Sequence, residues 1–158
     1  MSSPQKPFHI VLIEPEIPPN TGNIARLCAA TGSVLHLVGK LGFSIDDKHL
    51  KRAGLDYWEH VALRRWETLD ELRQAYPGGR WWLTSKKAER SYTEVDFRPG
   101  DFILFGKETQ GLPEELLAAH PDCAIRIPIF CAGVRSLNLS TAAGIVLYEA
   151  LRQDGRLS

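Results

Sequence analysis

The chain has 158 residues, 44% of them hydrophobic, which is enough apolar chain to form the core of one ordinary soluble domain. Nineteen basic residues balance nineteen acidic ones, so no overall field attracts nucleic acid, and any such binding needs a local patch. The three cysteines, Cys28, Cys123 and Cys131, form no C-x-x-C pair, which argues against a disulfide framework or a zinc finger.

Short apolar runs alternate with amphipathic segments along the chain. Runs of strand length lie at 8–13, 34–38, 61–63, 80–84, 101–105 and 124–127. Segments with helical spacing or end signals lie at about 21–32, 46–53, 67–76, 113–119 and from 139 onward. Strands that alternate with helices predict an α/β fold with a mostly parallel sheet flanked by helices. No repeat or linker interrupts the pattern, which predicts a single domain over residues 1–158.

Three prolines interrupt the segment after the first expected strand. Because proline lacks an N–H and clashes with the preceding helical turn, we expect Pro15, Pro18 and Pro19 to lie in a loop. A helix is expected only from about Thr21. Cys28 lies in its apolar run and is expected to be a small core residue.

The last expected helix follows a dense polar cluster. Apolar residues at 139, 142, 143, 146, 147, 150 and 151 form one helical face. We expect Asn138, Ser140 or Thr141 to cap this helix. A cap does not also require Arg135 and Ser136, and a helix entry offers unpaired N–H groups and a partial positive charge. The surplus of polar side chains therefore indicates a functional site.

Three loops at the ends of expected strands contain more glycine, proline and polar residues than a simple turn needs. They follow Ile13, Phe105 and Ile127. Ligands of parallel α/β sheets bind beyond the carboxyl ends of the strands, so these loops predict a composite site. Gly106 and Gly111 in the second loop would let the main chain approach a ligand closely, although a turn alone also explains them.

Several common catalytic classes lack their motifs. No G-x-G-x-x-G follows a strand, and Leu112 and Pro113 stand where a P-loop needs lysine and serine or threonine. There is no G-x-S-x-G elbow, and the five histidines lack metal-ligand spacing, so no metal is expected. The N-terminus carries no secretory signal and no apolar run has bilayer length. We therefore expect a cytoplasmic protein that does not bind a membrane.

The chain resembles the SpoU-like branch of the SPOUT RNA methyltransferases in three stretches that follow the family's order. They are Asn20–Arg26, Phe105–Leu112, and Ile127–Ile129 with Arg135–Ser140. Within this branch, Glu14–Asn23 and Arg52–Tyr57 resemble small stand-alone members. Those enzymes methylate the ribose 2′-hydroxyl of the wobble nucleotide of tRNA, which is cytidine or modified uridine at position 34. The likeness extends from about Phe8 to Gln153.

The resemblance implies a trefoil knot in the C-terminal part, S-adenosylmethionine as cofactor, and a homodimer with its site at the subunit interface. It implies cofactor contacts at Leu83, Gly106, Gly111, Ile127, Ile129, Ser136 and Leu137. The implied catalytic residues are Arg26, Glu108, Ser136 and Asn138. Asn20 and Arg26 are expected to contact the RNA, and the charges of Lys48, Lys51 and Arg52 extend that expectation to the following short helix.

Two of these residues leave alternatives open. In the family, the arginine that matches Arg26 is proposed as the base, but a guanidinium stays protonated in ordinary protein environments. We therefore prefer a bidentate grip of Arg26 on a neighbouring phosphate. Glu108 is expected to brace Asn20, Arg26 or the loop, with a solvent-facing acid at a helix entry as the alternative.

Further surface features give weaker hypotheses. The pairs Arg64–Arg65 and Lys86–Lys87 could extend a surface that follows phosphates. The four tryptophans could stack on an exposed base, but at least one of Trp81 and Trp82 is expected to lie in the core. The segment Phe130–Val134 is more apolar, and about one residue longer, than the link expected in the nearest relatives.

Other interpretations of the function remain. The same chemistry could act at another tRNA position or on ribosomal RNA, or the fold could serve as a non-catalytic RNA-binding module. A module for another adenine ligand is a third possibility. Relatives directed at large RNAs often carry an added RNA-binding domain, for which 158 residues leave no room. A small target, such as the anticodon loop of tRNA, is therefore expected.

Overall fold

The computed structural model describes residues 6–44 and 58–157, and a six-stranded sheet forms its centre. Every pairing between neighbouring strands is parallel, in the order β3-β2-β1-β5-β4-β6. The strands are β1 (His9–Ile13), β2 (Val34–Val38), β3 (Ala62–Trp66), β4 (Trp81–Thr84), β5 (Phe102–Phe105) and β6 (Ala124–Ile125). The predicted α/β fold with a mostly parallel sheet is confirmed, and the described sheet is parallel throughout.

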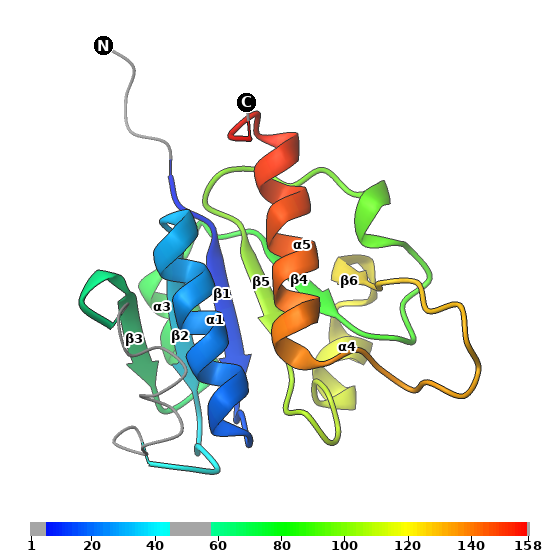
Figure 1. Cartoon of the computed structure of the whole chain (residues 1–158), viewed down its shortest axis with the longest axis horizontal. Helices are drawn as coiled ribbons and strands as arrows, with labels where there is room; N and C mark the ends of the chain where they lie inside the picture. Colours follow the sequence, from blue (N-terminus) through cyan, green and yellow to red (C-terminus); the bar gives the residue numbers. More distant parts are fainter. Residues whose placement is uncertain (1–5, 45–57, 158) are drawn as a thin grey trace.

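Helices cover both faces of the sheet. They are α1 (Pro18–Thr31), α3 (Leu69–Ala75), α4 (Glu114–Ala119) and α5 (Leu139–Gln153), with short 3-10 turns η1 (Trp58–His60), η2 (Tyr92–Glu94) and η3 (Pro121–Cys123). Helices α1 and α5 lie side by side on one face (Figure 1). Helices α3 and α4 pack against the other face. None of the described helices is long and apolar enough to cross a membrane. The helix expected at 46–53, with Lys48, Lys51 and Arg52, lies outside the described residues.

Alternating side chains of the central strands fill two cores. Ile10 and Leu12 of β1 pack with α1 and α5, whereas Val11 and Ile13 pack with α3 and α4. Because successive side chains of a strand point to opposite faces, a strand covered on both faces must be apolar throughout. This explains the uninterrupted apolar run. Cys28 is fully buried, as predicted, and burial raises the pKa of its thiol to about 12.

Helix α1 begins earlier than the sequence pattern predicts. It starts at Pro18, so the expectation that the prolines lie outside the helix is wrong for Pro18 and Pro19. The first turn of a helix makes no internal bond through its N–H groups, and proline is tolerated there because its missing N–H would be unpaired anyway. As a result Asn20 lies in the first turn, where it is buried.

The two edge strands also differ from expectation. Strand β3 extends to Trp66 because it pairs with β2 over its full length, while Arg64 and Arg65 are exposed. Strand β6 stops at Ile125, because its neighbour β4 ends at the paired Thr84, and the next residue, Arg126, pairs with Ser91 in an isolated bridge instead. Residues 127–138 then form an extended loop that swings away from the body, drawn in orange in Figure 1.

A chain of buried polar rings joins the first three strands. The indole Nε1 of Trp66 donates to Nδ1 of His36 at 3.0 Å, and Nε2 of His36 lies 2.8 Å from Nδ1 of His9. Since the indole can only donate, His36 must be protonated on Nε2 and donate to His9. Both histidines are buried, which lowers the pKa of His9 to about 4 and that of His36 to about 3. These three hydrogen-bonded rings are therefore neutral at physiological pH.

Candidate functional site

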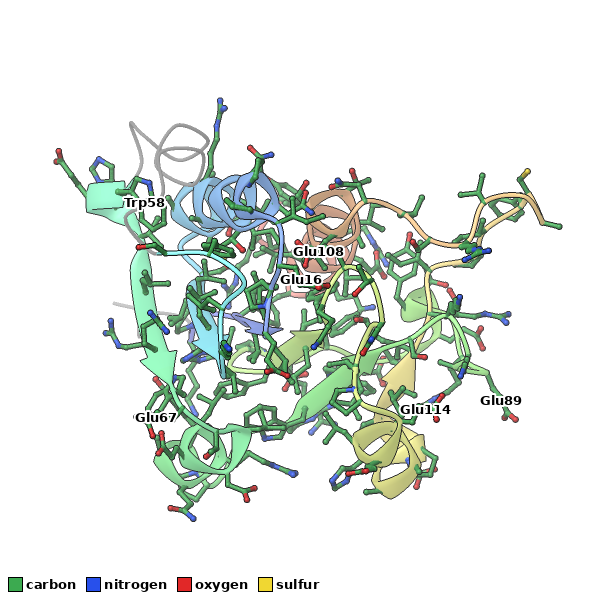
Figure 2. The ribbon with its side chains drawn as sticks, turned by 90° about the horizontal axis from the view of Figure 1, so that it is seen from below. Glu16, Trp58, Glu67, Glu89, Glu108 and Glu114 are labelled. Carbon is green, nitrogen blue, oxygen red and sulfur yellow. The ribbon has the colours of Figure 1, made fainter. Side chains whose placement is uncertain are left out.

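The three predicted loops meet at one cavity beyond the carboxyl ends of β4, β5 and β6. The cavity measures about 670 Å³, within the range of about 300–1,000 Å³ that is usual for ligand sites. Its wall combines polar side chains with apolar ones, among them Ile125, Ile127, Ile129, Leu137 and Leu139. Figure 2 views the molecule from this end, with the start of α1 and the start of α5 beside each other. The three loops therefore lie together, as predicted, in the wall of one cavity.

Glu108 joins the β5–α4 loop to the start of α1. Its carboxylate accepts hydrogen bonds from the backbone N–H groups of Glu16 and Ile17, both at 2.8 Å, and from the side-chain amide of Asn20 at 3.2 Å. Ile17 is the N-cap of α1 and has no side-chain oxygen to offer. Glu108 instead accepts the backbone N–H of this N-cap residue and places its carboxylate at the positive end of the helix. The alternative of a solvent-facing acid at a helix entry is wrong.

Asn20 and Asn138 connect the starts of α1 and α5. The Nδ2 group of Asn138 donates to Oδ1 of Asn20 at 3.0 Å. Oδ1 of Asn138 accepts the backbone N–H groups of Ser140 at 2.9 Å and Thr141 at 3.3 Å, so Asn138 is the cap of the last helix. A continuous path of hydrogen bonds thus runs from Glu108 through Asn20 to Asn138. All three residues line the cavity.

The β5–α4 loop folds tightly on itself at Gly106 and Gly111. A Cβ on Gly106 would lie 1.9 Å from the carbonyl carbon of Gly111, which no side chain can tolerate. Gly111 has φ of +70°, in the left-handed region that favours glycine, and its N–H donates to the carbonyl of Lys107 at 2.8 Å. Both glycines are therefore required by the turn itself, and both line the cavity.

Most of the predicted site residues lie together. Those that line the cavity are Asn20, Gly106, Glu108, Gly111, Ile127, Ile129, Ser136, Leu137 and Asn138. Arg26 lies on the exposed surface of α1 and does not line the cavity. Leu83 is buried inside β4 and instead lines a second cavity of about 350 Å³ between α3 and α4. Lys48, Lys51 and Arg52 lie outside the described residues.

The end of β4 contributes residues that sequence motifs did not identify as part of the ligand cavity. Thr84, Ser85, Lys86 and Lys87 line it, next to Arg135 from the last loop. The available signal was position, because β4 is adjacent to β5 and both strands end at the same edge of the sheet. Lys87 pairs with Glu114 at 3.0 Å, and Lys107 lies 3.8 Å from Glu14. The wall of the cavity therefore carries several basic side chains.

The three tryptophans of the described strands make contacts inside the fold. Trp66 bonds to His36, Trp82 donates to Asp101 at 2.8 Å, and the ring of Trp81 stacks on Phe102 with centroids 4.4 Å apart. Trp82 is buried, as expected for at least one of the adjacent pair.

Within residues 6–44 and 58–157, no three His, Cys, Asp or Glu side chains come together as possible metal ligands.

Known proteins resemble this chain over nearly its whole length. Residues 7–148 match the model of the SpoU rRNA Methylase family. A protein of Geobacillus stearothermophilus, provisionally described as a tRNA (cytidine(34)-2'-O)-methyltransferase, is 53% identical over 150 residues, which cover 93% of this chain and 95% of the relative. The tRNA (cytidine(34)-2'-O)-methyltransferase of Methylovorus glucosotrophus is 49% identical over 147 residues, with coverage of 92% and 95%.

Solved structures share the fold closely. One, which concerns the 2-OH methylation of C/U34 on tRNA, has a TM-score of 0.90 at 48% identity and covers 95% of this chain and 97% of its own. An AdoMet-bound rRNA methyltransferase from Sinorhizobium meliloti has a TM-score of 0.82 at 30% identity. It covers 94% of this chain, which in turn spans 57% of that protein.

Proposed function

The chain belongs to the SpoU rRNA methylase family, and we propose that it transfers a methyl group from S-adenosylmethionine to the ribose 2′-hydroxyl of nucleotide 34 of tRNA. Relatives about 50% identical carry this activity in their names. The observation that carries the proposal is the cavity, because the three stretches that resemble the family's motifs meet in its wall. The wobble nucleotide in question is cytidine or modified uridine.

The cavity suits S-adenosylmethionine in size and chemistry. An adenine ring needs an apolar slot with backbone groups at its edge, and Ile127, Ile129 and Leu137 form such a wall beside the loop of Gly106 and Gly111. Ser136 and Asn138 also line the cavity, where they can orient the ribose or the methionine end. When bound, the cofactor supplies a methyl group on a positively charged sulfur.

Arg26 is proposed to grip the phosphate next to the target ribose and to aim its hydroxyl at the methyl group. Methyl transfer is an in-line displacement, so alignment of donor and acceptor and exclusion of water account for much of the rate. A guanidinium stays protonated and binds phosphate with two parallel hydrogen bonds, which suits positioning better than proton removal. Asn20, Lys48, Lys51 and Arg52 are proposed to contact the RNA as well.

The active enzyme is proposed to be a homodimer with its site at the subunit interface, on a C-terminal trefoil knot. Arg26 does not line the cavity of its own chain, which supports a site that receives this side chain from a second copy. Mixed dimers of Arg26→Ala and Gly106→Ala chains test this arrangement. If Arg26 acts in the partner's site, the mixed dimer keeps one intact site and regains activity that neither variant has alone. No recovery, or a monomeric active enzyme, would overturn it.

Methyl transfer from labelled S-adenosylmethionine to bulk tRNA, followed by nuclease digestion and mass spectrometry, tests the reaction. A 2′-O-methylated nucleoside at position 34 is expected. Arg26→Ala should lower methyl transfer by roughly a hundredfold while cofactor binding stays unchanged, and Arg26→Lys should not restore it, because a point charge lacks the bidentate fork. Methylation of ribosomal RNA alone, or binding of RNA without methyl transfer, would favour the alternative functions. We also propose a cytoplasmic location, as a tRNA substrate implies.

A further inference from the structure

Glu16 and Thr109 form a second connection between the two loops that Glu108 joins. Oε1 of Glu16 accepts the backbone N–H of Thr109 at 3.1 Å and its hydroxyl at 2.7 Å. The contact is the reverse of the one made by Glu108, whose carboxylate accepts the backbone N–H groups of Glu16 and Ile17. Each of the two loops therefore supplies a carboxylate that accepts hydrogen bonds from the other loop. Figure 2 shows Glu16 and Glu108 next to each other between α1 and α5.

We propose that Glu16 and Thr109 are positioning residues for methyl transfer. They hold residues 106–111 of the β5–α4 loop, here called the cofactor loop, at a fixed position relative to the start of α1. The proposal rests on the proposed function. Residues 106–111 line the cavity assigned to the cofactor, and Asn20, in the first turn of α1 of the same chain, lines that cavity too and is assigned to the RNA. A fixed distance between the loops therefore fixes Asn20 relative to the methyl donor. Reaction rate depends steeply on the placement of such positioning groups.

The backbone before Glu16 supports a functional role for this contact. Glu14 has φ of +51°, the only left-handed residue other than glycine in the described parts of the chain. Such a conformation costs free energy and persists only where surrounding contacts enforce it. Here the N–H of Glu14 donates to the carbonyl of Val38 at 2.8 Å. The side chain of Glu14 also packs against Gly39, where a Cβ added to the glycine would lie only 2.9 Å from Cγ of Glu14. The turn directs the following residues, Pro15 and Glu16, toward the β5–α4 loop.

Each loop is also held independently of the Glu16–Thr109 contact. The cofactor loop is closed by the bond from Gly111 to Lys107, and the start of α1 is capped by Glu108. Loss of the Glu16–Thr109 bonds should therefore leave both loops folded and loosen their relative position, which the Glu108 bonds alone would then hold. This argument predicts an effect on kcat with little effect on cofactor affinity.

The bonds from Thr109 lower the pKa of the Glu16 carboxyl below its ordinary value, so the contact is charge-assisted at neutral pH. The geometry also explains why threonine stands at position 109, since a hydroxyl adds the shorter of the two bonds. Serine provides the same hydroxyl, whereas valine keeps the shape of threonine without it.

A double-mutant cycle on the intact enzyme tests the pair. Glu16→Ala should lower kcat roughly tenfold and Thr109→Val a few-fold, while the Kd for S-adenosylmethionine and the melting temperature stay near the wild-type values. In the Glu16→Ala background, Thr109→Val should have no further effect, because both changes remove the same contact. Thr109→Ser should restore the wild-type kcat. Glu67→Ala, a change of an exposed glutamate far from these loops (Figure 2), is the matched control.

Two results would overturn the proposal. Effects of Glu16→Ala and Thr109→Val that simply add, or that appear only in the Kd for the cofactor, would show that the residues do not act as one positioning pair. If Glu16→Ala prevents folding, Thr109→Val and Thr109→Ser decide the question alone, and an unchanged kcat in Thr109→Val rejects the pair. A wild-type enzyme that methylates no RNA would reject the proposed function and the pair together, so the two failures are distinguishable.

Discussion

Two of the hydrogen-bonded polar networks among residues 6–44 and 58–157 differ in place and charge. The first runs from Glu108 through Asn20 to Asn138 at the carboxyl ends of the strands, where it lines the cavity. The second runs from Trp66 through His36 to His9 within the layer between β1, β2, β3 and α3. Each network joins segments that are far apart in the sequence.

The difference between the networks lies in what each can do for the protein. The loop network contains a carboxylate and ends at the exposed amide of Asn138, so it can hold loops in place and still face a ligand. The histidine network is buried and neutral, and its groups have no access to the cavity. Changes in the first should therefore alter activity, and changes in the second should alter stability.

The largest effect is expected from Gly106→Ala, because the new Cβ would collide with backbone atoms of Gly111 and Leu112. The loop must open, so binding of S-adenosylmethionine should weaken by roughly a hundredfold. Isothermal titration calorimetry measures this affinity. Gly78→Ala is the control, since nothing lies within 4 Å of its Cβ. Wild-type affinity in Gly106→Ala would show that the loop is not part of the cofactor site.

Glu108→Gln tests the loop network directly. Glutamine offers a single acceptor oxygen and no charge, so at least one of the N–H groups of Glu16 and Ile17 loses its partner. Methyl transfer should fall roughly tenfold, with a loss of about 1 kcal/mol in the free energy of unfolding, as for other helix caps. Glu115→Gln, at the exposed start of α4, serves as the control. An unaltered rate would separate the network from activity and break the comparison.

His36→Leu tests the buried network. It leaves the indole N–H of Trp66 and Nδ1 of His9 without partners, which should lower the free energy of unfolding by roughly 2–4 kcal/mol. Methyl transfer per folded molecule should be unchanged at 25 °C. Urea denaturation and a rate assay measure the two quantities, and His60→Leu at an exposed position is the control. A slower reaction at full folding would show that the two networks are not separate.

The buried histidines should also make stability depend on pH. Histidines in the unfolded chain take up protons near pH 6.5, whereas His9 and His36 in the folded protein do so only at about 4 and about 3. The unfolded state therefore binds more protons between pH 6.5 and about 3, and the free energy of unfolding falls as pH is lowered through this range. Urea denaturation at several pH values should show a shallower fall in His36→Leu. Equal slopes in the two proteins would contradict the assigned neutral state.

Much of the fold could be predicted from the pattern of apolar residues. Strand β2 was predicted over its full length, and β1, β4 and β5 within one residue at each end, because buried parallel strands must be apolar throughout. The start of α1 was not, since the rule against proline in helices does not apply to the first turn. The end of β6 depends on where β4 stops, which is a property of the pairing and not of the segment itself.

Some features of the site could likewise be predicted from the sequence, and others could not. The three loops, their glycines and a cap of the last helix at Asn138, Ser140 or Thr141 could be predicted from the sequence, because turns and helix caps are local and require particular residue types. Contacts between loops about ninety residues apart, from Glu108 to Ile17 and from Glu16 to Thr109, followed only from the order of the strands. Strand order places β5 next to β1 and so brings their loops together. Local chemistry thus determined which loops could form a site, and the pairing of strands decided which side chains meet there.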